Sequence, residues 1–85
     1  KIICFGDSLT SCGGLGGRYS DILQDRFPNH VILNRGAGGE TWKDGLERLA
    51  RDVLAEHPDV VLLEYGANDW WRDERSPTAW ATDLE

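Results

Sequence analysis

The sequence predicts an α/β fold in which helices cover both faces of a parallel sheet. Three short apolar runs, rich in β-branched residues, alternate with segments whose apolar residues recur at helical spacing. The runs are continuous in hydrophobicity, which is typical of strands buried on both faces. Alternating strands and helices favour a parallel sheet with right-handed crossovers, so we expect the order β-α-β-α-β-α.

The predicted strands cover residues 1–5, 30–34 and 59–65. The turn residues Pro28-Asn29 and Pro58-Asp59 precede the second and third strands, where ordinary turns are expected.

The first predicted helix follows the first strand. Its apolar face comprises Tyr19, Ile22, Leu23 and Phe27, and Pro28 ends it. Ser76-Pro77 resembles an N-cap followed by proline at the first helical position, which predicts the start of a third helix there.

The second predicted helix has the clearest periodicity. Thr41 and Asp44 have the spacing of a capping box at its start. The residues of its apolar stripe are Leu46, Leu49, Ala50, Val53 and Leu54, with Trp42 one turn earlier.

Length and charge limit the classes of function. The chain has 85 residues, which suits one domain, and 9 Lys and Arg against 15 Asp and Glu give a net charge of −6. This excess of acidic residues argues against nucleic acid and anionic membranes as partners. No apolar run approaches the ~18 residues of a membrane span. No signal peptide is visible, which favours the cytoplasm while leaving the compartment open.

The two ends suggest a partial domain. The chain has no Met, begins inside a strand pattern and stops shortly after a predicted helix start. We therefore expect residues 1–85 to be the N-terminal part of a single domain whose remainder is missing.

Glycines and small polar residues follow each predicted strand. Asp7 and Ser8 follow the first strand, Gly39 follows the second, and Asn68 follows the third. The carboxyl ends of parallel strands meet at one edge of a sheet, which is where such folds bind ligands. A serine hydroxyl near backbone N–H groups and a side-chain amide indicates acyl transfer, with Ser8 as nucleophile. The alternative is that Ser8 only forms a turn.

Other glycine-rich and catalytic motifs do not fit. The glycine segments at 13–17 and 36–39 fail the G-x-G-x-x-G pattern, and G-x-x-x-x-G-K-[ST] is absent. The G-x-S-x-G elbow fails because Thr10 occupies its last position. Cys4 and Cys12 have no metal-ligand spacing and suggest no disulfide framework.

Three segments carry a resemblance to a known family. Gly6-Asp7-Ser8-Leu9 resembles block I of the GDSL family, also called SGNH hydrolases. Residues 34–41 are similar to its N-x-G-x-x-G-[DE]-T block, and residues 66–69 to its G-x-N-D block. The three occur in the order of the family, each at the carboxyl end of a predicted strand.

The resemblance implies a three-layer αβα, flavodoxin-like fold and a serine ester hydrolase that needs no metal or cofactor. It also implies the strand order 2-1-3, in which the third strand here is an open apolar edge that invites pairing with other chains. The 85 residues alone are therefore expected to be marginally stable or prone to aggregation.

The resemblance also implies roles for individual residues. Ser8 is the nucleophile, and the N–H groups of Ser8 and Gly39 form an oxyanion hole with the Asn68 amide. Asp7 orders the loop beside the substrate, and Asp69 does the same beside Asn68.

The implied substrate is a small-molecule ester, and the sequence does not choose among acetyl esters, lysophospholipids and acetylated sugars. Trp70 and Trp71 directly follow Asp69 and are expected to line the substrate pocket.

The general base of the family is missing from the sequence. That base is a His in a late D-x-x-H block, which these residues do not contain. His30 and His57 lie at the amino ends of predicted strands, and a five-residue strand is ~16 Å long. A base must lie within ~3 Å of the hydroxyl, so neither histidine can serve Ser8. The chain alone is therefore expected to be inactive.

Two other functions stay open. One is a non-catalytic carbohydrate-binding or scaffolding module that uses a cleft beside Trp70 and Trp71. The other is Mg²⁺-dependent phosphoryl transfer through Asp7 and Asp69, which follow two strands.

Overall fold

The fold was analysed in a computed structural model, which describes residues 1–71, 78 and 82. The strands are β1 (Ile2–Gly6), β2 (Ile32–Gly36) and β3 (Val60–Glu64), and the helices are α1 (Ser8–Ser11), α2 (Tyr19–Arg26), α3 (Trp42–Asp52) and α4 (Ala67–Trp71). A 3-10 turn, Leu54–Glu56, follows α3. The third helix expected from Ser76-Pro77 lies outside the described residues.

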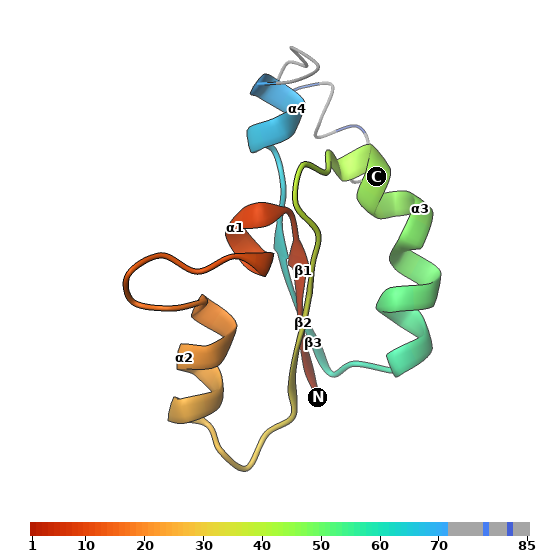
Figure 1. The fold of residues 1–85 in the computed structure, drawn as a ribbon. Helices are drawn as coiled ribbons and strands as arrows, with labels where there is room; N and C mark the ends of the chain where they lie inside the picture. The colour runs from red at the N-terminus through yellow and green to blue at the C-terminus, as the bar shows by residue number, and fades with distance from the viewer. Residues whose placement is uncertain (72–77, 79–81, 83–85) are drawn as a thin grey trace.

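The strands form a parallel sheet in the order β2-β1-β3. In this register Gly6 at the end of β1 lies opposite Gly36 of β2 and Glu64 of β3. Helix α2 covers one face of the sheet and α3 covers the other (Figure 1). The α/β class, the parallel sheet and the helices on both faces are therefore confirmed.

The core lies along the central strand. Ile3, Cys4 and Phe5 are fully buried, and the Phe5 ring meets Trp42 of α3 edge-on, with 6.2 Å between centroids. Strand β3 differs from the prediction of burial on both faces, because its four apolar residues are 38–46% exposed. In the part of the chain that the structure describes, β3 pairs only with β1 and forms an open edge.

Helix α3 begins as predicted, and its predicted stripe is confirmed in part. Thr41 and Asp44 form both hydrogen bonds of a capping box. Of the predicted stripe, Val53 is fully buried and Leu49 packs against the core, whereas Leu46 and Leu54 are 40% and 56% exposed.

Trp42 and Gly45 are buried, so the buried face of the helix is rotated toward them. Gly45 packs against Tyr65, which directly follows β3. A Cβ on Gly45 would lie 2.7 Å from Tyr65 Cζ, so the close approach needs a glycine.

The segments after β1 and β3 are helical where loops were expected. The Asp7 side chain caps α1 by accepting a hydrogen bond from the Leu9 N–H at 2.9 Å. The segment with Asn68 and Asp69 forms α4. None of the described helices is long and apolar enough to cross a membrane.

Candidate active site

Ser8 is the first residue of α1 and directly follows the carboxyl end of β1. The carbonyl of Asp7 accepts hydrogen bonds from Thr10 and Ser11 at 3.1 and 3.0 Å, which closes the turn that carries Ser8. Gly6 must be glycine here, because a Cβ would meet the Glu64 carbonyl and the Thr10 hydroxyl, both at 2.4 Å. The turn therefore holds Ser8 at the sheet edge where the sequence placed it.

The segment after β2 passes beside Ser8. A Cβ added to Gly38 would lie 3.8 Å from the Ser8 Cβ, so the space between the Gly38 backbone and the serine side chain is about the size of one methyl group. Gly39 adopts φ +78°, a left-handed conformation that glycine accepts without strain. The Ala37 N–H donates to the Gly6 carbonyl at 2.9 Å, which ties this segment to the end of β1.

Asn68 joins the same edge from α4. Its Nδ2 donates to the Glu40 carbonyl at 2.9 Å, next to Gly39 in the chain. The structure thus links the segments of Ser8, Gly39 and Asn68 through direct contacts between neighbouring residues. An amide N–H that points at an oxygen bound to a serine can stabilise negative charge there, and these segments bring the candidate amides of Gly39 and Asn68 to the sheet edge that carries Ser8.

Asp7 and Asp69 hold backbone in place. Asp7 is fully buried and Asp69 is 1% exposed. Asp69 Oδ2 accepts the Trp42 N–H at 3.0 Å, so this carboxylate fixes the start of α3. Each carboxylate thus accepts a backbone N–H through one of its oxygens, Asp7 Oδ1 from Leu9 and Asp69 Oδ2 from Trp42.

Glu64 lies beside Asp7 at the end of β3. Its Oε1 accepts a hydrogen bond from the Thr10 hydroxyl at 3.0 Å, and that hydroxyl also bonds the Tyr19 OH at 2.9 Å. Burial, and then the neighbouring Asp7 carboxyl group, raise the pKa of Glu64 to about 7. Sequence analysis missed Glu64 because it was read only as the end of an apolar run.

Arg48 of α3 was also missed. Its guanidinium donates to the Glu40 carboxylate at 2.7 Å and to the Gly6 carbonyl at 3.2 Å. Arg48 lies outside the predicted apolar stripe, yet it is one turn after the buried Gly45. That i, i+3 spacing is the signal that could have placed it near the sheet.

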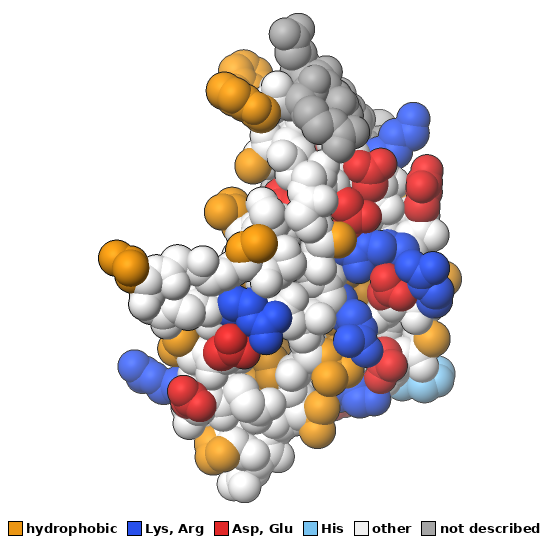
Figure 2. Space-filling view, viewed as in Figure 1, with side chains coloured by type: hydrophobic (Ala, Val, Ile, Leu, Met, Phe, Trp, Pro, Cys, Tyr) orange, Lys and Arg blue, Asp and Glu red, His pale blue; other side chains and the backbone are white. Residues whose placement is uncertain are grey.

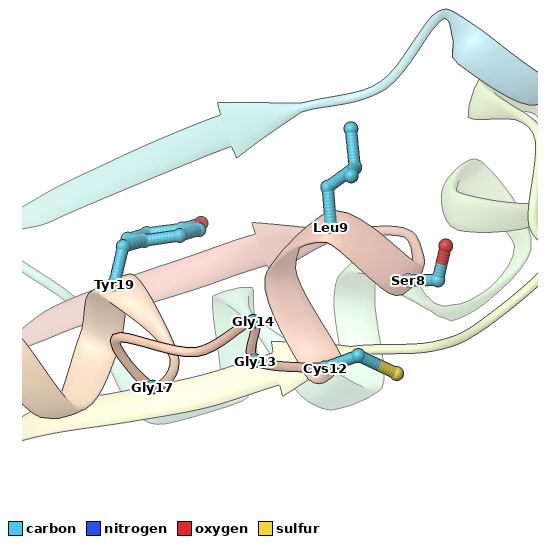
Figure 3. Close-up of a pocket in the computed structure, with 7 residues that line it drawn as sticks. All are labelled: Ser8, Leu9, Cys12, Gly13, Gly14, Gly17 and Tyr19. Atoms are coloured by element: carbon cyan, nitrogen blue, oxygen red, sulfur yellow. The ribbon is translucent and has the colours of Figure 1, made fainter.

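A hollow of about 450 Å³ opens beside Ser8. It lies between α1, the glycine segment at 13–17 and the start of α2, and Figure 3 shows Ser8 and Tyr19 at its two ends. Leu9 and Cys12 also line it. The hollow is large enough for a small acyl or alcohol group.

Trp70 and Trp71 are 66% and 83% exposed, so they are not part of the core. With Leu9, which is 64% exposed, they place hydrophobic side chains on α1 and α4, along the edge where Figure 2 shows orange surface. Their contact with substrate stays a prediction.

The two histidines lie at the opposite end of the sheet. His30 precedes β2 and His57 precedes β3, whereas Ser8 follows the carboxyl end of β1 in the same parallel sheet. The structure therefore agrees that neither can act on Ser8.

The sequence of this chain is similar to those of known esterases and lipases. Residues 4–85 match the model of the GDSL-like Lipase/Acylhydrolase family. The chain belongs to the GDSL-like lipase/acylhydrolase family. An acetylxylan esterase from Geobacillus stearothermophilus is 34% identical over 94 residues, covering 91% of this chain and 43% of that protein. An arylesterase from Vibrio mimicus is 34% identical over 79 residues, covering 85% of this chain and 39% of that protein.

A solved GDSL relative shows the same architecture. The lipase/acylhydrolase from Enterococcus faecalis superposes with a TM-score of 0.81 at 32% identity, covering 98% of this chain and 47% of that one. The chain thus spans less than half the length of these GDSL relatives. The predicted family and its α/β fold are confirmed.

Proposed function

We propose that the protein containing this chain is a serine ester hydrolase, and that residues 1–85 form the N-terminal part of its single catalytic domain. The observation that carries the proposal is the joining of the three segments at one sheet edge, where Ala37 donates to the Gly6 carbonyl and Asn68 donates to the Glu40 carbonyl. Membership of the GDSL family supports it.

The proposed reaction is acyl transfer through Ser8. The Ser8 Oγ bonds to the ester carbonyl carbon while its proton passes to a general base, and the carbonyl oxygen becomes an oxyanion. The N–H groups of Ser8 and Gly39 and the Asn68 amide stabilise that charge. The C–O bond to the alcohol then breaks, and water releases the acyl group from Ser8. The base would come from a part of the domain outside these residues.

Ser8→Ala in the full-length protein tests the proposal. We expect turnover of p-nitrophenyl acetate to fall about a thousandfold or more, because the nucleophile is gone. Ser11→Ala is the matched control, since Ser11 lies in the same short helix and should leave turnover within about twofold of wild type. Unchanged turnover in Ser8→Ala would exclude Ser8 as nucleophile.

We further propose a small ester as substrate: an acetyl ester, a lysophospholipid or an acetylated sugar. The size of the hollow beside Ser8 and the esterase relatives support this class. The exposed Trp70 and Trp71 provide flat apolar faces on which a sugar or aryl ring can stack.

Trp70→Ala and Trp71→Ala test this contact. We expect at least one of them to raise KM for an acetylated xylo-oligosaccharide about tenfold, and to change KM for p-nitrophenyl acetate less than twofold. Equal effects on both esters would contradict sugar stacking.

A non-catalytic carbohydrate-binding module remains the second candidate, because the same exposed tryptophans could bind sugar without chemistry. Sugar binding by a full-length protein that hydrolyses none of the three ester types would favour it.

A further inference from the structure

One arginine of α3 reaches all three segments around Ser8. Arg48 Nε donates to Glu40 Oε1 at 2.7 Å, and its Nη2 donates to the Gly6 carbonyl at 3.2 Å and the Tyr65 OH at 3.1 Å. The Tyr65 OH in turn donates to the same Glu40 oxygen at 3.2 Å. Arg48 Nη1 donates to Asp52 Oδ2 at 3.2 Å, which anchors the guanidinium to its own helix.

This cluster is well shielded from water. The side chains of Arg48 and Glu40 are 12% and 18% exposed, and the guanidinium carbon lies 4.5 Å from the centroid of the Phe5 ring. Burial lowers the pKa of Arg48, but the hydrogen bonds to Glu40 and Asp52 and the charge interactions with Tyr65 and Glu40 together outweigh it and leave the pKa raised. The guanidinium therefore stays charged, and its partners are held by charge-assisted hydrogen bonds.

Two of these contacts, with Gly6 and Glu40, end close in the chain to residues of the proposed site. The Gly6 carbonyl is separated from Ser8 only by Asp7, and Glu40 directly follows Gly39. The Glu40 backbone carbonyl accepts the hydrogen bond of Asn68 Nδ2 at 2.9 Å. Glu40 is thus held by Arg48 through its side chain and holds Asn68 through its backbone.

We propose that Arg48, acting through Glu40, is a positioning residue that sets the placement of Gly39 and Asn68 relative to Ser8. This inference rests on the proposed function. A guanidinium donates in several fixed directions from one plane, whereas a lysine ammonium cannot reproduce that fork. Lysine at this position keeps the charge and loses the simultaneous hold on Glu40, Tyr65 and Gly6.

Arg48→Lys in the full-length protein tests the proposal. We expect kcat for p-nitrophenyl acetate to fall about 10- to 100-fold, with KM changed less than threefold, because misplaced donors weaken transition-state stabilisation. Inhibition by phenylboronic acid, which forms a tetrahedral anion on a serine hydroxyl, should weaken by the same factor as kcat.

Arg51→Lys is the matched control. Arg51 also pairs with Asp52 from α3, but its side chain is 78% exposed and contacts none of the three segments. We expect its kcat and boronate inhibition to stay within twofold of wild type.

Glu40→Gln keeps the size and one acceptor oxygen but removes the charge that Arg48 pairs with. If the two residues act as one unit, the double variant with Arg48→Lys should lose no more than about threefold beyond the worse single variant. Thermal melts of each variant, with active sites counted by fluorophosphonate labelling, separate loss of folded enzyme from loss of kcat per site.

The outcomes distinguish the two proposals. Loss of activity in Ser8→Ala together with equal kcat in Arg48→Lys and Arg51→Lys overturns the role of Arg48 and leaves the proposed function intact. Additive losses in the double variant overturn the link through Glu40. Unchanged turnover in Ser8→Ala removes the proposed function itself.

Discussion

Asp7 is buried, yet its Oδ2 receives no hydrogen bond from any N–H or O–H group among the described residues. A buried carboxylate oxygen without a donor is costly, on the order of 1–3 kcal/mol or more. The Glu64 carboxyl group beside it has a pKa raised to about 7, chiefly by burial and then by Asp7. A proton on Glu64 would give Asp7 the missing donor and remove the repulsion between the two carboxylates.

The raised pKa of Glu64 predicts a pH dependence of stability. The folded state holds this proton more tightly than the unfolded chain, whose pKa is near the ordinary 4.5. The stabilisation of the folded state by protonated Glu64 is therefore complete below about pH 4.5 and is lost as pH rises to about 7. Wild-type full-length protein should lose thermal stability over this range relative to Glu64→Gln, which cannot ionise. Parallel pH profiles of the two melting temperatures would contradict the assignment.

The proposed role of Asn68 in the oxyanion hole predicts that its substitution lowers kcat. Asn68→Ala removes an oxyanion donor and the hydrogen bond to Glu40, so kcat for p-nitrophenyl acetate should fall about 10²- to 10³-fold. Asn29→Ala, in the turn before β2, is the control and should match wild type. A kcat within twofold of wild type in Asn68→Ala would remove this residue from the proposed oxyanion hole.

Single residues differ in how well the sequence predicts them. Ser8, Gly39 and Asn68 follow strands in short local patterns, so their shared edge could be predicted before the structure. The partners of Arg48 and Glu64 could not be predicted, because they are distant in sequence: Arg48 contacts Gly6, and Glu64 contacts Thr10. Only the packing of α3 and β3 against β1 brings those groups together.

At α3, Gly45 allows the helix to approach the sheet closely. Ala is the better helix former by roughly 1 kcal/mol, yet a Cβ here would lie 2.7 Å from Tyr65 Cζ. The Tyr65 ring cannot move freely, because it packs 5.2 Å from Trp42 and 5.5 Å from Phe5, measured between centroids.

We therefore expect Gly45→Ala to destabilise the full-length protein by about 1–3 kcal/mol in chemical denaturation. Glu47→Ala, on the exposed side of the same helix, should change stability by less than about 0.5 kcal/mol. A Gly45→Ala variant more stable than wild type would show that Tyr65 yields easily.

The elements themselves were largely predictable. Hydrophobic runs and caps located three strands and two helices, and the capping box at Thr41 was confirmed. The rotation of α3 was not predictable, because a glycine carries no hydrophobic signal and its close contact with Tyr65 arises only in the folded chain. The single turns α1 and α4 were read as loops, because glycine and polar residues obscure such short helices.

At the scale of the whole molecule, the apolar side chains of β3 are exposed at the edge of the sheet. Val60, Val61, Leu62 and Leu63 are 38–46% exposed, and the strand pairs on one side only in the described part of the chain. We expect the isolated 85-residue chain to associate through this edge or melt without cooperativity. Sedimentation and a thermal melt of that chain check this, and a monomer with a single sharp transition would contradict it.

The glycine segment at 13–17 stands apart from the contacts that hold Ser8. A Cβ added to Gly14 or Gly16 would meet nothing within 4 Å, although this segment walls the hollow beside Ser8. Side chains can therefore be introduced there without disturbing the turn at Asp7 or the cluster around Arg48. If the proposed function holds, substitutions at Gly14 or Gly16 are therefore expected to change which esters bind while leaving the reaction at Ser8 intact.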